Sequence, residues 1–194
     1  MKRHTLAFLF ATAIVLPGSA LAGAGSAEAA VGPFAGARGT FGPYSEGRVA
    51  TTYDPSLVPA GATGRVYSMS GKYTGTFTTL SVSGLRPERQ YGAHVHEKPC
   101  GASGGDAGPH FQNVADPAAD GGASTDPAYA NADNEIWLDF TTSERGSALA
   151  SSHVKWAFGE RKPASVVIHE HSTSTEHGHA GDAGARLACV NVDF

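Results

Sequence analysis

Short runs of alternating apolar and polar residues recur along most of the chain after residue 47. In one of them Ile136, Leu138 and Phe140 occupy every second position. Successive side chains of a β-strand point to opposite faces of a sheet, so this period of two predicts half-buried strands. Turn residues separate the runs. The predicted strands lie within 47–54, 64–71, 73–85, 90–97, 135–142, 148–159, 164–171 and 186–194.

The spacing of these eight segments predicts an all-β fold, either an antiparallel sandwich or a barrel. No window combines a helical hydrophobic period with start and stop signals. Two long polar segments, 98–134 and 171–185, interrupt the even spacing. Loops of that length in a compact domain are usually functional or disordered, and each of these holds histidine. We therefore expect two functional loops.

The N-terminal residues have the layout of a secretory signal peptide. Basic residues precede an apolar stretch at 6–16, and small residues follow at 20–22. We expect cleavage after 1–22, or at a second small-residue site a few residues later, and a secreted, extracytoplasmic protein with no lipid-anchor cysteine. The stretch 23–46 is rich in Gly and Ala and predicts a flexible leader. Residues 47–194 are expected to form one domain, and no further stretch predicts a membrane span.

Charge and cysteine content narrow the possible partners. The full chain has 14 basic and 18 acidic residues, and loss of the predicted signal peptide leaves 12 against 18, a formal charge of -6. This balance gives no support to nucleic-acid binding. The only cysteines, Cys100 and Cys189, would meet an oxidising compartment after export, where an even pair usually forms a disulfide.

Four histidines are candidate metal ligands. His94 and His96 would project to the same face of a predicted strand, so both rings can reach one ion. His169 ends a predicted buried strand, and His110 follows a Gly-Pro turn. Each has an ordinary structural explanation when taken alone: a solvated strand end for the pair, a satisfied core side chain for His169, and a loop hydrogen bond for His110.

The order and surroundings of these histidines resemble the copper/zinc superoxide dismutase family. The resemblance rests on "GAHVHEKPCG", "GPHF", "VVIHE" and "AGARLAC", and it extends from about residue 65 to the C-terminus. It implies an eight-stranded antiparallel Greek-key β-barrel, an immunoglobulin-like sandwich. It also implies copper ligation by His94, His96, His110 and His169, with His110 as a proton donor in catalysis. Arg186 would guide the anionic substrate, and Cys100 and Cys189 would form the family's internal disulfide.

The loop after His110 departs from the zinc-containing members of the family. In those members this loop supplies two more histidines and an aspartate to zinc, whereas here no histidine occurs between His110 and His153. The loop offers only carboxylates, a poor donor set for tetrahedral zinc. We therefore expect a copper-only member without zinc, in which a carboxylate orients the free nitrogen of His110. Glu135 is the first candidate and Asp133 the second, unless both simply begin a strand and face water.

The second long loop is shorter than the corresponding family loop. Asp182 is a candidate for holding the ring of a copper ligand, by analogy with an acidic residue of the family. His171, His177 and His179 are candidates for binding a second metal or for passing copper inward from a copper donor, although such residues are more often simply solvated.

The expected reaction is conversion of superoxide to oxygen and hydrogen peroxide by Cu(II)/Cu(I) cycling. An extracytoplasmic copper carrier or scavenger with little dismutase turnover would use the same ligands and is the alternative. A blue-copper electron carrier is disfavoured because no histidine follows Cys189. A metal-free adhesive sandwich would leave the order of the histidines unexplained.

Overall fold

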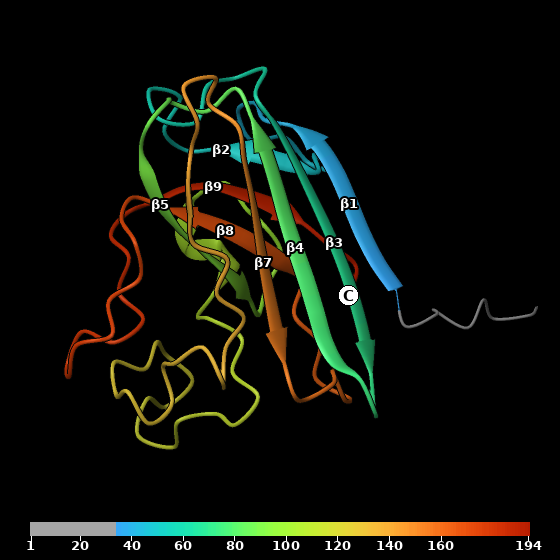
Figure 1. Cartoon of the computed structure of the whole chain (residues 1–194), viewed down its shortest axis with the longest axis vertical. Helices are drawn as coiled ribbons and strands as arrows, with labels where there is room; N and C mark the ends of the chain where they lie inside the picture. The colour runs from blue at the N-terminus through green and yellow to red at the C-terminus, as the bar shows by residue number, and fades with distance from the viewer. Residues whose placement is uncertain (1–33) are drawn as a thin grey trace, which may run out of the picture. The chain divides into compact units, whose positions relative to one another are not determined.

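The structure is a computed structural model that describes residues 34–194. Nine strands and one short 3-10 helix, η1, make up its regular elements (Figure 1). No helix in this range is long and apolar enough to cross a membrane. In chain order the elements are β1 (Phe34–Thr40), β2 (Ala50–Thr52), β3 (Thr63–Gly71), β4 (Gly75–Ser83), β5 (Gln90–His96), η1 (Gly104–Ala107), β6 (Phe140–Thr141), β7 (Ala148–Val154), β8 (Ser165–His169) and β9 (Arg186–Asn191).

The strands form two sheets in which all neighbouring strands are antiparallel. The four-stranded sheet has the order β1-β3-β4-β7, and the five-stranded sheet has the order β2-β9-β8-β5-β6. In Figure 1 the strands of the five-stranded sheet cross behind those of the four-stranded sheet. The all-β prediction is confirmed: seven of the nine strands fall within the predicted segments, and β3 begins one residue before its segment.

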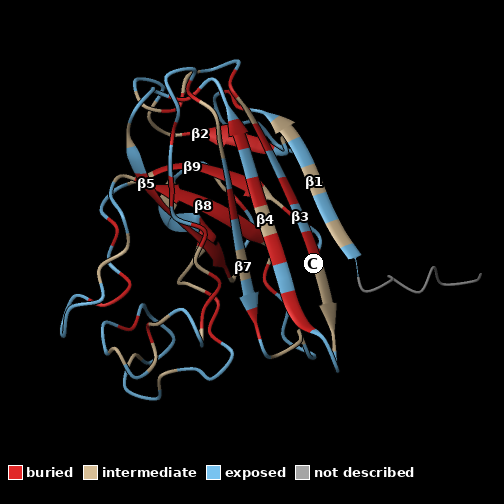
Figure 2. Ribbon diagram, in the orientation of Figure 1, coloured by how far each residue is buried: buried red, intermediate tan, exposed pale blue. Residues whose placement is uncertain are grey.

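A single hydrophobic core fills the space between the two sheets. In β3 and β4 buried and exposed residues alternate, with Val66 and Leu80 directed inward and Arg65 and Ser81 exposed (Figure 2). β8, in contrast, is buried at every position. Its inner face lies in the core, and its outer face lies beneath polypeptide from the long loops, which is why its sequence lacks clean alternation. This covered outer face carries the candidate site.

Strand β1 corrects the prediction of a flexible leader over 23–46. Its residues Phe34–Thr40 pair in register with β3. The inward positions of β1 hold Ala35, Ala37 and Gly39, because at Gly39 a side chain would meet the Cβ of Ala50 at 2.7 Å. Such small residues give no hydrophobic period, so the strand was not predicted. Residues 23–33 of the expected leader and the expected signal peptide lie outside the described residues.

Candidate metal centre

Four imidazoles meet on the outer face of the five-stranded sheet. The candidate ligand atoms of His94, His96, His110 and His169 all lie within 4.8 Å of one another. This is the only group of three or more potential metal-ligating side chains within residues 34–194. The structure therefore brings together the four histidines that the sequence singled out.

Strand register explains how residues so distant in sequence converge. His94 and His96 alternate with Ala93 and Val95, which point into the core, so both rings face outward. On the neighbouring strand β8, His169 pairs with Gly92. The bulge between Ile168 and His169 shifts the β8–β9 register there.

His110 and its neighbours extend the same face beyond the end of regular pairing. Isolated antiparallel bridges join His96 to His110, His94 to Trp137, and Gln112 to Glu135. With a period of two along each segment, the side chains at these positions share the face of the copper-ligand candidates. The apolar partners at 136 and 138 point into the core.

Each of three rings is held through the nitrogen that points away from the centre. The Nδ1 atom of His96 lies 3.0 Å from the carbonyl oxygen of Gly108. The Nδ1 atom of His110 lies 2.8 Å from Oε2 of Glu135, a carboxylate that is only 1% exposed. The Nε2 atom of His94 lies 2.6 Å from Oγ1 of Thr173. Imidazoles that bind metals are typically oriented by such contacts at their second nitrogen.

The rings also have the protonation state that a metal requires. His94 and His96 are fully buried and His169 is 4% exposed. Burial, followed by the nearby His110 and His169, lowers the pKa of His94 and His96 well below the usual value. Burial, followed by His110 and Arg186, lowers the pKa of His169 to about 3. At neutral pH these imidazoles are therefore uncharged and keep a lone pair for coordination.

Two ring nitrogens of the cluster are buried without a hydrogen-bond partner within residues 34–194, Nδ1 of His94 and Nδ1 of His169. Because Thr173 already engages Nε2 of His94, Nδ1 is the nitrogen of that ring that remains for a ligand. Buried polar atoms are rarely left unpaired. The gathered imidazole nitrogens form a donor set that suits copper in both of its oxidation states. The residues present thus fit a copper ion.

Arg186 lies beside this centre at the start of β9. It is the register partner of His169. Its Nη1 donates to the carbonyl oxygen of Gly104 at 2.9 Å, and a Cβ at Gly104 would lie 2.7 Å from the Cβ of Arg186. Burial lowers the pKa of Arg186, but a guanidinium stays protonated in proteins. His110, His169 and Arg186 line a cleft of about 280 Å³.

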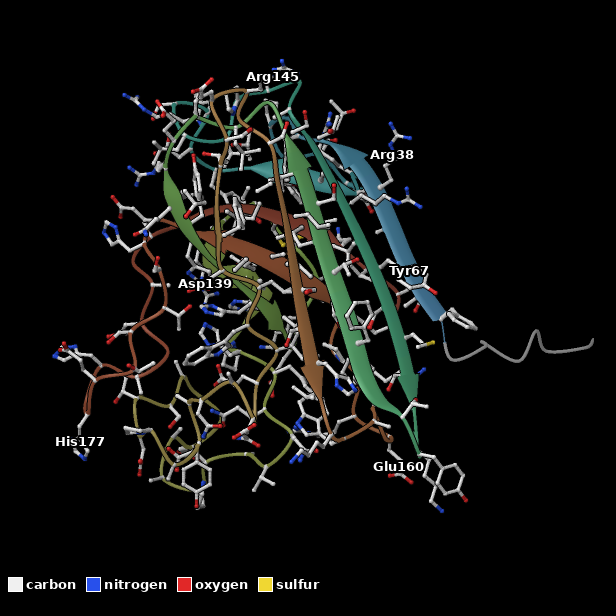
Figure 3. All side chains as sticks on the ribbon, in the orientation of Figure 1. Arg38, Tyr67, Asp139, Arg145, Glu160 and His177 are labelled. Atoms are coloured by element: carbon white, nitrogen blue, oxygen red, sulfur yellow. A yellow bond between two sulfur atoms is a disulfide. The ribbon has the colours of Figure 1, made fainter. Side chains whose placement is uncertain are left out.

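The remaining site candidates fall in different places. Asp133 is exposed and its carboxylate has no hydrogen bond or ion pair within residues 34–194. Asp182 lines the cleft together with His110 and His169, but within residues 34–194 the one side chain its carboxylate contacts is His179, with Oδ2 3.4 Å from Nδ1. His171 and His177 are exposed, and His177 projects from the tip of its loop, far from Asp139 (Figure 3).

The cysteines form the expected disulfide. Cys100 and Cys189 are bonded and are buried in a small cluster with Ala107 and Val167. The bond ties the segment that carries η1 and Gly104 to β9. It therefore supports the backbone carbonyl that holds Arg186.

Sequence reasoning missed four polar groups around the rings. Gln112 and Trp137 donate to Glu135, while Thr173 and Asp139 lie behind His94. The alternation at Ile136, Leu138 and Phe140 would have placed residues 135, 137 and 139 on the face opposite the core. No comparable signal marked Thr173.

Comparison with known proteins agrees with this geometry. The family described as copper/zinc superoxide dismutase (SODC) matches residues 62–192, and the chain belongs to it. The chain is thus an oxidoreductase of the superoxide dismutase class. No curated protein matches the chain.

The chain is similar to two solved structures, among others. The Cu/Zn superoxide dismutase from Brucella abortus is 16% identical, with a TM-score of 0.52 and coverage of 81% of this chain and 99% of that one. A double mutant of a SOD-like protein from Bacillus subtilis is 20% identical, with a TM-score of 0.49 and coverage of 66% and 87%.

Proposed function

We propose that the chain is a secreted, copper-dependent superoxide dismutase that works without zinc. Two superoxide ions and two protons would give one oxygen and one hydrogen peroxide. The observation that carries the proposal is the cluster of four imidazoles opening into a cleft beside Arg186. His94, His96, His110 and His169 would hold the copper. When bound, copper supplies the Cu(II)/Cu(I) couple that takes an electron from one superoxide and gives it to a second.

Arg186 would attract the substrate to the open side of the centre. Superoxide is an anion and the mature chain is expected to carry a net negative charge. A local positive charge in a cleft focuses the field and raises encounter rates by roughly ten- to a thousandfold. The guanidinium shares its cleft with His110, whose side chain, at 12% exposed, is the most accessible of the four rings.

His110 would deliver a proton from Nε2, the nitrogen that Glu135 leaves for the metal, at the stage when this nitrogen does not hold copper. Its Nδ1–H donates to the carboxylate of Glu135, because the carboxylate can only accept. A proton taken up at Nε2 makes an imidazolium, and the adjacent buried carboxylate stabilises that charge. Nε2 can then pass the proton to the reduced oxygen species in the cleft. Glu135 thus serves His110 both as an orienting group and as a counter-charge.

Two features support a site without zinc. The Nδ1 atom of His110 already has a partner in Glu135, so it is not free for a second metal. Two of the four carboxylates of the 113–134 loop are engaged in turns of that loop: Asp116 accepts from Ser124 Oγ and Ala118 N, and Asp126 accepts from Ala128 N. Side-chain hydrogen bonds of this kind can order a loop without a metal.

The proposal also includes secretion of the protein and a Greek-key arrangement of its strands. A disulfide is usual in exported proteins, which agrees with the secretory signal expected at 1–22. The two antiparallel sheets are compatible with the Greek-key barrel that the family resemblance implies, in which eight strands would form the barrel itself.

Metal analysis combined with a turnover assay tests the function. The mature protein, loaded with copper, should bind about one copper and little zinc and should remove superoxide rapidly. Stoichiometric zinc would refute the copper-only centre. Tight copper binding with negligible turnover would favour a copper carrier or scavenger, in which the exposed His171, His177 and His179 would receive the metal from a copper donor.

A further inference from the structure

A second polar chain begins at Nε2 of His94. Nε2 of His94 lies 2.6 Å from Oγ1 of Thr173, and this hydroxyl donates to Oδ1 of Asp139 at 2.7 Å. The same Oδ1 accepts from the backbone N–H of Ala93 at 3.1 Å. The other carboxylate oxygen, Oδ2, accepts from the backbone N–H of Thr173 at 2.7 Å.

The direction of these hydrogen bonds fixes the state of the imidazole. A hydroxyl has one proton, and here the Asp139 carboxylate accepts it, so Oγ1 can only accept from His94. His94 must therefore carry its proton on Nε2. This leaves the lone pair on Nδ1, a buried nitrogen that has no hydrogen-bond partner within residues 34–194. The tautomer follows from the network, as it must where hydrogens are not seen.

The same contacts seat the second loop on the sheet. Thr173 belongs to the 171–185 loop, and both its backbone N–H and its hydroxyl bind the one carboxylate. This loop passes directly over Gly92, where a Cβ would collide with the carbonyl oxygen of His171. His94 is thus held between its own strand and a loop that Asp139 fixes in place.

We propose that Thr173 and Asp139 are positioning residues that hold His94 as the Nε2–H tautomer with Nδ1 directed to the metal. This inference rests on the proposed copper site, to which it adds the means by which one ligand is prepared before the ion arrives. It also transfers to Thr173 and Asp139 the task that the sequence assigned to Asp182.

Three variants separate this role from general structural support. Thr173→Val removes the hydroxyl but keeps the backbone N–H that binds Asp139. Thr173→Ser keeps the hydroxyl and should behave as the native protein does. Asp139→Ala removes the acceptor, so the Thr173 hydroxyl proton is free to turn to His94. Thr141→Val is the matched control, because Thr141 is exposed on β6.

The first measurement uses the metal-free protein and is independent of activity. Imidazole nitrogen NMR, with His94 assigned by comparison with His94→Gln, should show the Nε2–H tautomer in the native protein, in Thr173→Ser and in Thr141→Val. Thr173→Val and Asp139→Ala should show a mixture of tautomers. An unchanged His94 spectrum in both of these variants would overturn the inference.

The second measurement is copper affinity by competition with a chelator. Loss of an orienting partner typically lowers metal affinity about 10- to 100-fold. We expect a loss in that range for Thr173→Val, recovery in Thr173→Ser, and no change in Thr141→Val. Equal affinity in Thr173→Val and the native protein would contradict the inference. If the native protein binds no copper, the proposed function fails, while the tautomer measurement still decides the role of Thr173.

Discussion

Glu135→Gln is a nearly isosteric change that tests whether a buried carboxylate supports His110. Glu135 is 1% exposed and accepts three hydrogen bonds. Oε2 accepts from Nδ1 of His110 at 2.8 Å and from Nε1 of Trp137 at 2.7 Å. Oε1 accepts from Nε2 of Gln112 at 2.8 Å. All three partners are donors, so the site requires a group with two acceptor atoms.

The cost of the change follows from this count. The carbonyl oxygen of a glutamine can still accept from His110 and Trp137, but its NH2 group would then face the NH2 group of Gln112. Gln112 cannot turn its amide around without losing the bond from the backbone N–H of Asp116 to its Oε1, at 3.1 Å. One buried donor is therefore left unpaired, at about 1 to 3 kcal/mol. Two charge-assisted bonds also become neutral, which brings the expected loss to about 2 to 4 kcal/mol.

Urea unfolding of the metal-free protein measures this loss, with the exposed Glu144→Gln as the control. In the copper-loaded protein we expect turnover to fall about 10- to 100-fold, since His110 loses the counter-charge for its imidazolium. Three ligands do not depend on Glu135, so bound copper should persist. A stability change below about 0.5 kcal/mol together with native turnover would refute the role assigned to Glu135.

Three other changes probe separate parts of the site. Arg186→Ala should lower kcat/KM for superoxide about tenfold and weaken its salt dependence while copper is retained, whereas the exposed Arg65→Ala should not; equal rates for both would exclude local guidance. Replacing Cys100 and Cys189 by serine should cost about 4 to 5 kcal/mol in urea unfolding, because the bond closes a loop of 89 residues; a loss under about 1 kcal/mol would contradict the chain-entropy argument. Because the pKa of His169 is lowered in the folded protein, this side chain is protonated at a higher pH in the unfolded chain than in the folded one. The metal-free protein should therefore lose stability as pH falls from about 6.5 toward 3. A urea midpoint that does not decrease when the pH is lowered from 7.5 to 5 would rule this out.

The strands and the four rings could be predicted because their signals are local. Alternation identifies a strand wherever large apolar side chains occupy one face, as at 136, 138 and 140. β1 was not predicted because close packing against Ala50 requires small residues at its inward positions, and small residues give no hydrophobic period. The pair His94 and His96 needed only the period of a strand, and the remaining ligands entered through their resemblance to known motifs.

The groups that orient the rings were harder to predict because loop paths place them. Glu135 could be nominated because it lies near the end of the loop that follows His110. Asp182 was nominated for the ring of a copper ligand, yet the two arms of its loop pair with each other through Ser174 and the backbone at 181 and 182. That pairing turns Asp182 toward His179 and leaves Thr173 nearest the ring. The Thr173 hydroxyl depends on a hydrogen bond to Asp139, which lies in another segment of the chain. No local sequence pattern indicates such a pairing.

The three orienting contacts use three different acceptors, and this has a consequence for how metal binding and folding are linked. His96 is held by a backbone carbonyl, His110 by a carboxylate, and His94 by a hydroxyl that is itself bound to a carboxylate. All three rings are ordered before an ion arrives, so binding energy is not spent on ordering them. Burial of His94, His96 and His169 lowers their pKa values, so it opposes folding of the metal-free chain where the unfolded chain would bind protons, below about pH 6.5. An ion that binds the folded chain alone stabilises it by RT ln(1 + [L]/Kd), about 4 kcal/mol at a thousandfold excess over Kd. Thermal stability should therefore report copper occupancy even in a variant with no turnover.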